Sequence, residues 1–167
     1  MNGMAAMMPG NGPKNGPKNG PRNGDAPGDE LTKADYERLS AFRYVVRKFL
    51  AFSAEAAEGA GLTAQQHQAL LTIKGFPGRE EVTIGELAER LALRHHSTVG
   101  LVDRLALRGL VNRRSDPNDR RSVLVTLTGE ASVLLARLSR VHREELAHLS
   151  PTLIGLLEEL VSPAVVK

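Results

Sequence analysis

Arginine, the side chain best suited to binding phosphate, is concentrated in one part of this chain. From residue 94 to residue 121 there are seven Arg, three Asp and no Lys or Glu, a local balance of +4, whereas the whole chain carries only +3. The same stretch begins with Arg94, His95, His96, Ser97 and Thr98. Guanidinium, imidazole and hydroxyl groups donate hydrogen bonds to phosphates and base edges. The stretch is therefore a candidate nucleic-acid interface.

Two short helices are predicted to carry the first half of this stretch. Capping-box patterns, Thr63 with Gln66 and Thr83 with Glu86, begin two helices, and the second of these covers residues 84–91. The turn LALR then leads into the next helix, from about His96 to Arg108, ended by Gly109. We expect its buried stripe to consist of Val99, Val102, Leu105 and Ala106. The other faces of the helix, some of them open to a partner, would then carry Ser97, Thr98, Leu101 and Arg104.

A β-hairpin is predicted to follow. Residues 111–114 and 122–127 favour strands, and Asp116, Pro117 and Asn118 form the loop between them. Helix, turn, helix and an Arg-bearing hairpin is the layout of a winged helix-turn-helix, whose second helix enters the DNA major groove. The predicted fold class is therefore mainly α, with a small β-hairpin wing and a helical dimerisation region.

The candidate DNA-binding residues each have a second interpretation. We expect Arg120 to enter the minor groove, whereas Arg121 braces the loop by pairing with Asp116 or Asp119. Ser97 is either a DNA contact or an ordinary N-cap, and the two neighbouring histidines are contacts or plain surface. Arg104 binds a phosphate or pairs with an acid, and Leu101 could contact a thymine methyl. Three further arginines are expected either to contact the DNA backbone or to be solvated surface: Arg94, Arg113 and Arg114.

The remaining sequence predicts three further regions. Residues 1–28, with the repeats NGPK, NGPK and NGPR, are expected to be a disordered tail. Residues 29–62 and 128–167 are expected to form the dimerisation region around the DNA-binding region 63–127. Thr128 begins a helix to about residue 149, and Ser150 with Pro151 begins a separate last helix. The last helix is so apolar that we expect it to be covered by a second copy of the chain.

Several classes of protein are disfavoured. There is no Cys, so no thiolate metal site is expected, and the five His have no shared ligand spacing. His142 and His148 are assigned to a solvated helix face. No apolar run approaches the roughly 20 residues of a membrane span, and no signal segment is seen, so we expect a cytoplasmic protein. No enzyme motif is present, and neither enzymatic activity nor a cofactor is expected.

Residues 31–161 resemble the MarR family of transcriptional regulators. The most specific signature is the wing SDPNDRRSVLVTLT, directly after RGLVNRR, and LTAQQHQALLTI resembles the family's helix before the DNA-binding region. The family wing usually has Asp-x-Arg-Asp-x-Arg. Here Asn118 stands where the family has its first Arg, so one wing contact differs, and we retain Asn118 as a candidate contact.

The resemblance implies a homodimer that binds a palindromic operator, usually as a repressor, and that is released by a small aromatic or anionic molecule. In relatives the first two helices border the effector pocket. The residues that such a pocket would use here are Arg43, Tyr44, Phe49, Phe52 and His67, although core packing is the alternative for the aromatic residues. The competing function is a winged helix used for nonspecific DNA binding or protein contact, without an effector.

Overall fold

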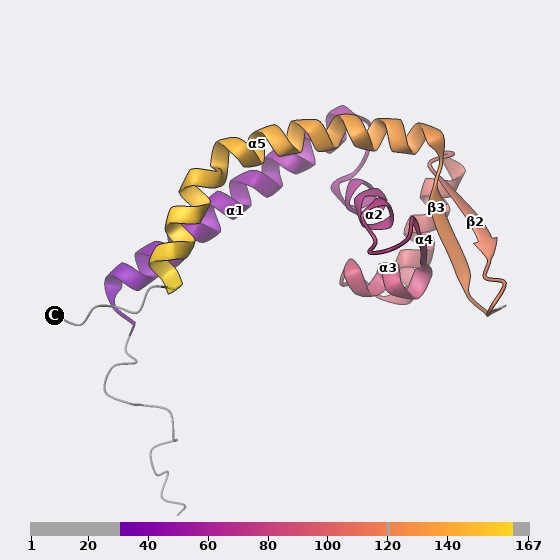
Figure 1. Cartoon of the computed structure of the whole chain (residues 1–167), viewed down its shortest axis with the longest axis horizontal. Helices are drawn as coiled ribbons and strands as arrows, with labels where there is room; N and C mark the ends of the chain where they lie inside the picture. Colours follow the sequence, from indigo (N-terminus) through magenta and orange to yellow (C-terminus); the bar gives the residue numbers. More distant parts are fainter. Residues whose placement is uncertain (1–30, 120, 162–167) are drawn as a thin grey trace, which may run out of the picture.

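A computed structural model describes residues 31–119 and 121–161. The elements are α1 (Lys33–Gly59), α2 (Ala64–Lys74), β1 (Glu81–Thr83), α3 (Ile84–Arg90), α4 (His95–Leu107), β2 (Val111–Ser115), β3 (Val123–Leu127) and α5 (Gly129–Val161). Figure 1 shows α1 and α5 side by side as a curved arm, with α2, α3, α4 and the sheet gathered in a lobe at one end. The predicted mainly helical fold with a small wing is confirmed. The predicted N-terminal tail and Arg120 lie outside the described residues.

Capping boxes begin three of the helices. In each, a Thr hydroxyl accepts from a backbone N–H three residues on, and that residue's side chain accepts from the Thr backbone N–H. The pairs are Thr32 with Asp35, Thr63 with Gln66 and Thr83 with Glu86. The second and third pairs were predicted, because a capping box is a local pattern that the sequence displays directly.

Thr128 joins the end of α4 to the beginning of α5. Its hydroxyl accepts from the N–H of Ala131 at 3.2 Å, as expected of a residue that caps α5. The same hydroxyl donates to the carbonyl oxygen of Gly109 at 2.9 Å. Gly109 follows α4 with φ +68°, a conformation that glycine adopts without a steric penalty. One side chain therefore sets the direction in which α5 leaves the lobe.

The sheet has three antiparallel strands in the order β1-β3-β2. The predicted hairpin supplies β2 and β3, and the short extended piece before α3 is its third strand. In the centre, Val125 of β3 faces Val82 of β1 on one side and Arg113 of β2 on the other. Val82 and Val125 are both fully buried, so the sheet is held to the helices on one face.

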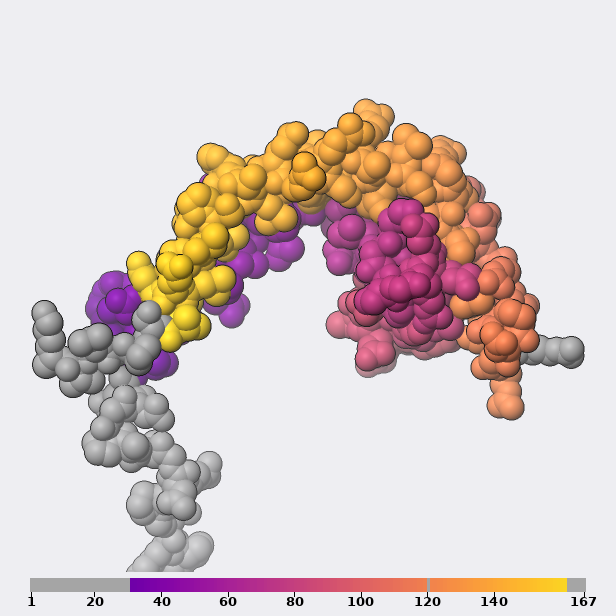
Figure 2. Space-filling model, viewed as in Figure 1, coloured from indigo at the N-terminus to yellow at the C-terminus, as the bar shows by residue number. Residues whose placement is uncertain are grey.

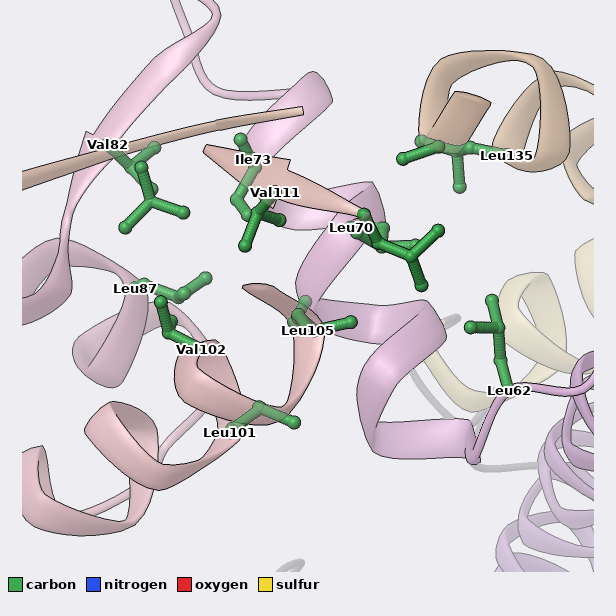
Figure 3. Close-up of a cluster of buried hydrophobic side chains, with 14 of the residues drawn as sticks. Leu62, Leu70, Ile73, Val82, Leu87, Leu101, Val102, Leu105, Val111 and Leu135 are labelled. Atoms are coloured by element: carbon green, nitrogen blue, oxygen red, sulfur yellow. The ribbon is translucent and has the colours of Figure 1, made fainter. Parts of the chain in front are cut away.

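One hydrophobic core links the lobe to the arm. Figure 3 shows its side chains converging from α2, α3, α4 and β2, with Leu62 and Leu135 joining them from the arm side. Ala57, Ala131 and Leu138 belong to the same cluster. Because these arm residues are buried with the lobe, the base of the arm is fixed to the lobe. The predicted region boundaries at residues 62/63 and 127/128 fall within this shared core.

The prediction of two C-terminal helices is wrong, because α5 is one helix of 33 residues with Pro151 inside it. Proline lacks the N–H that would bond to the carbonyl oxygen of Ala147. The hydroxyl of Ser150 donates to that oxygen at 3.0 Å instead, so the carbonyl keeps a partner. Despite its length, neither α5 nor any other described helix is apolar enough over 18 residues to cross a bilayer.

The turn between α3 and α4 contains a strained residue. Ala92 has φ +51°, in the left-handed region, while its N–H donates to the carbonyl of Glu89 at 3.0 Å. This conformation costs an L-residue roughly 1–2 kcal/mol. The turn nevertheless keeps it, because Leu93 N–H bonds to the Ala88 carbonyl at 2.9 Å and so ends α3.

We predict that Ala92→Gly raises the free energy of unfolding by up to about 1 kcal/mol. Glycine removes the left-handed strain, and this gain is partly offset by the greater entropy of the unfolded chain. Urea unfolding measures the difference. Ala136→Gly, at an exposed site within α5, is the control and should lower stability by about 1 kcal/mol. Equal destabilisation by both changes would show that the turn is unstrained.

Candidate nucleic-acid interface

The register of α4 differs from the predicted one. The helix begins at His95 with Arg94 as its N-cap, and its buried residues are Thr98, Leu101, Val102 and Leu105. Val102 and Leu105 were predicted, whereas Val99 and Ala106 are only half-buried. The spacing of the buried set is that of a single helical face. Packing of this face therefore decides which residues remain on the surface.

Three sequence predictions on α4 are corrected by this register. Thr98 was expected to contact DNA, but its side chain is fully buried and its hydroxyl donates to the carbonyl of Arg94 at 3.3 Å. Leu101, considered for a thymine contact, is also buried. Ser97 is not the N-cap, since Arg94 takes that position. The side chains of Thr98 and Leu101 therefore pack in the core beneath α4 and do not contact a partner.

The exposed side of α4 begins with a continuous run of polar residues. Arg94, His95, His96 and Ser97 are all exposed, and Arg104 is exposed about two turns beyond Ser97. The first backbone N–H groups of a helix lack partners within the helix and attract anions. Hydroxyl, imidazole and guanidinium donors thus surround an end of α4 that favours phosphate.

Two ion pairs connect the wing to the rest of the lobe. Arg113 of β2 pairs with Asp103 of α4, and Arg114 Nη2 lies 2.6 Å from Glu81 Oε2 of β1. Successive residues of a strand point to opposite faces, so the two pairs hold β2 from both sides. Such exposed pairs contribute only about 0–1 kcal/mol to stability. The pairs therefore act mainly by fixing the position of β2. A phosphate would have to compete with a carboxylate for either arginine.

Carboxylates also order the wing loop, through backbone groups. Asp116 Oδ1 accepts from the N–H of Asn118 at 2.8 Å, and Asp119 Oδ1 accepts from the N–H of Arg121 at 3.0 Å. The loop is closed by the N–H of Ser122, which donates to the Asp119 carbonyl at 2.8 Å. The side chains of Asn118 and Arg121 are exposed. The two aspartates therefore bond to the loop backbone, and the expected ion pair of Arg121 with Asp116 or Asp119 is not formed among the described residues.

The residues expected in an effector pocket are divided by the structure. Phe49, Phe52 and His67 gather around His142, with ring centroids 6.1, 5.9 and 4.6 Å away respectively. Arg43 and Tyr44 are instead exposed on α1. The assignment of His142 to a solvated face is wrong, because α5 turns it inward toward α1 and α2 at 9% exposure. Helical spacing alone could not reveal this, since it does not show which side of α5 the lobe covers.

His142 forms a hydrogen bond through each of its two ring nitrogens. Its Nδ1 lies 2.6 Å from the carbonyl oxygen of Leu138, which only accepts, so Nδ1 carries a hydrogen. Its Nε2 lies 2.7 Å from Ser53 Oγ of α1. His67 packs against this ring, and burial, with a smaller contribution from His142, lowers the pKa of His67.

An open hollow of about 380 Å³ lies beside this cluster, between α1 and α5. Its lining is Ala56, Gly59, Ala60, Leu134, Arg137, Leu138 and Val141, and includes none of the five predicted pocket residues. The described residues contain no group of three His, Asp or Glu side chains that could hold a metal ion.

An exposed helix end, a second helix packed behind it and an arginine-bearing hairpin have the layout of a winged helix-turn-helix. Residues 60–122 match the model of the MarR family. This match spans the region that carries α4 and most of the wing, and less than half of the chain. This region is therefore similar to the MarR family.

Solved structures share the fold over both arm and lobe. AbsC, a MarR family transcriptional regulator from Streptomyces coelicolor, has a TM-score of 0.65 at 18% identity, covering 80% of this chain and 93% of its own. Wild-type apo MarR from E. coli has a TM-score of 0.58 at 23% identity, covering 83% and 99%. NadR in complex with 4-hydroxyphenylacetate has a TM-score of 0.59 at 21% identity, covering 80% and 92%. A comparison with curated protein sequences finds no match.

The stacked histidines give the fold a pH dependence that can be measured. The pKa of His67 is lower in the folded protein than its ordinary 6.5, so below that pH the unfolded chain binds a proton that the folded chain resists. The free energy of unfolding should therefore be fully retained above about pH 7 and decrease as the pH falls through about 6.5 toward 5. Urea unfolding at several pH values tests this.

Two variants separate His67 from the other titrating groups. His67→Leu should flatten the decrease between about pH 7 and 5, because it removes the group whose protonation the fold resists. His148→Gln, at an exposed site on α5, should leave the decrease as it is in the wild type. An unchanged profile in His67→Leu would contradict the assignment.

Proposed function

We propose that this chain acts as a homodimer on a palindromic operator, as a repressor that a small aromatic anion releases. The observation that carries the proposal is the exposed first turn of α4, Arg94 to Ser97, on the same lobe as the arginine-rich wing. Two such lobes on one dimer would present two helices to successive major-groove segments of a duplex. Palindromic symmetry in the operator would then mirror the symmetry of the protein.

Apolar side chains on the arm support the dimer. In Figure 2 the arm of α1 and α5 projects away from the lobe. Large apolar residues are exposed near its free end, among them Tyr36 at 60% and Ile154 at 54%. Within one protomer, Arg38 Nε lies 3.2 Å from Glu159 Oε2 and joins the two helices there. An exposed apolar surface of this kind marks an association site, and a second copy of the arm would cover it.

The distribution of ion pairs supports the DNA contacts. Among the described residues, Arg94, Arg104 and Arg121 have no carboxylate within ion-pair distance, whereas Arg113 and Arg114 do. Cations without a carboxylate partner remain available to phosphates, and binding through them weakens as salt rises. Arg120 at the wing is proposed to enter the minor groove, where a narrow groove concentrates negative potential.

The junction of arm and lobe is where we place the effector. NadR has been solved in complex with 4-hydroxyphenylacetate, a phenolic carboxylate. In this chain the hollow between α1 and α5 offers an apolar lining and the guanidinium of Arg137. Leu138 connects the hollow to the aromatic cluster, since its side chain lines the hollow and its carbonyl bonds to His142. A ligand there would act on the contact through which the arm orients the lobe.

A footprint with matched variants tests the proposal. The wild type, as a dimer by sedimentation, should protect a pseudo-palindrome of roughly 16–22 base pairs, about two half-sites one duplex turn apart. Arg120→Ala should fold normally and bind it roughly tenfold more weakly or worse, because a charge-assisted hydrogen bond is lost. Arg143→Ala, an equal charge change at an exposed site on α5, should bind as the wild type does.

Two results would contradict the proposal. Protection of an isolated half-site by single copies would exclude the dimeric mode. Equal affinity for selected and scrambled duplexes would instead favour the competing function, a nonspecific DNA-binding or protein-contact module.

A further inference from the structure

The outward face of α4 contains a gap at Gly100. With about 100° of rotation per residue, the positions opposite the buried stripe are 96, 100, 103 and 107. They are occupied by His96, Gly100, Asp103 and Leu107, and all are exposed or partly exposed. A glycine inside a helix costs about 1 kcal/mol relative to alanine. Helix stability therefore does not account for glycine at this position, on the face that a partner would meet.

The side chain of Arg104 lies over this gap. A Cβ placed on Gly100 would lie 3.5 Å from Nη1 of Arg104. The guanidinium thus reaches back one turn toward the beginning of α4, the direction in which helical side chains extend. This brings the guanidinium close to the N-terminal half of the helix, where recognition helices contact base edges.

Arg104 is also available for a partner. No carboxylate pairs with it among the described residues, and its neighbour Asp103 is already paired with Arg113 of the wing. Asp103 is adjacent to Arg104 in the sequence, but its carboxylate is already paired with another arginine and does not pair with Arg104. An exposed guanidinium with no carboxylate beside it can present two parallel N–H groups to a planar acceptor.

We propose that Arg104 recognises a guanine in each half-site through O6 and N7, and that Gly100 is the positioning residue that lets the guanidinium lie flat along the helix. Bidentate binding to these two acceptors is the commonest specific contact of arginine in the major groove. A Cβ alone at residue 100 would meet the guanidinium at an ordinary contact distance, but a longer side chain would compete with the guanidinium for the same space. The proposal rests on the proposed function, because it requires operator binding through α4.

The first experiment identifies the guanine. The full wild-type chain selects its preferred duplex from a random library, and 7-deazaguanine, which lacks the N7 acceptor, then replaces each guanine in turn. At one symmetry-related position, this replacement should cost the wild type roughly tenfold in affinity, the effect of one hydrogen bond to a charged group. The same replacement should cost Arg104→Ala less than about twofold, because the partner is already absent.

The second experiment tests the role of Gly100. Gly100→Leu should raise the melting temperature, since leucine favours the helix more than glycine does. It should also weaken binding to the preferred duplex by roughly tenfold, as Arg104→Ala does, and leave binding to scrambled duplex unchanged. Gly155→Ala, at a helical glycine of α5 with no atom within 4 Å of an added Cβ, should raise the melting temperature without changing DNA affinity.

Three results would overturn the proposal, and they are distinguishable. If Arg104→Ala weakens preferred and scrambled duplexes alike and lowers the salt dependence by about one ion, Arg104 binds phosphate. If Gly100→Leu binds the preferred duplex as tightly as the wild type, the positioning role is excluded. If the wild type selects no preferred sequence at all, the proposed function itself fails, before any variant is compared.

Discussion

The rest of the structure depends on how one face of α4 packs into the lobe. Thr98, Leu101, Val102 and Leu105 are each at most 1% exposed. Because each residue turns a helix by about 100°, a shift of the register by a single position would bury a different set and expose a different interface. The polar first turn, the gap at Gly100 and the direction of Arg104 all follow from this one packing arrangement. The interface is thus determined by the core beneath it.

The same core joins the arm to the lobe that is proposed to bind DNA. Leu62 and Leu135 pack with residues of α2 and α4 in one cluster, and Thr128 bonds to the residue that ends α4. The stacked histidines add a polar contact among α1, α2 and α5 at the same place. A change in the angle of the arm would therefore move α4. This gives a dimer formed through the arms a physical means of setting the spacing of two recognition helices.

Local signals in the sequence predicted much of this fold. Two of the capping boxes and the hairpin were predicted because a few adjacent residues determine them. The stripe on α4 was predicted only in part, because apolar residues occur on several of its faces. Leu101 is followed by Val102, and Ala106 by Leu107, so periodicity does not select one face. Only packing against α2 and α3 decides between them.

Long-range contacts account for the other differences. The pairing of Arg113 with Asp103, and the stacking of His67 on His142, join residues whose distance along the chain carries no periodic signal. The Ser150–Pro151 pair is a strong start signal that α5 overrides, because a hydroxyl satisfies the carbonyl that proline leaves. Gly100 was not singled out at all, since its significance depends on the side chain that lies over it.

The most direct test of the account is thiol reactivity at two adjacent positions of α4. The chain has no Cys, so Ser97→Cys and Thr98→Cys each carry a single thiol. Ser97→Cys should react quickly with an alkylating reagent and should be protected by the preferred duplex, because position 97 is exposed. Thr98→Cys should react slowly with or without DNA, because position 98 lies in the core. Fast labelling of Thr98→Cys that DNA suppresses, with Ser97→Cys unaffected by DNA, would contradict it.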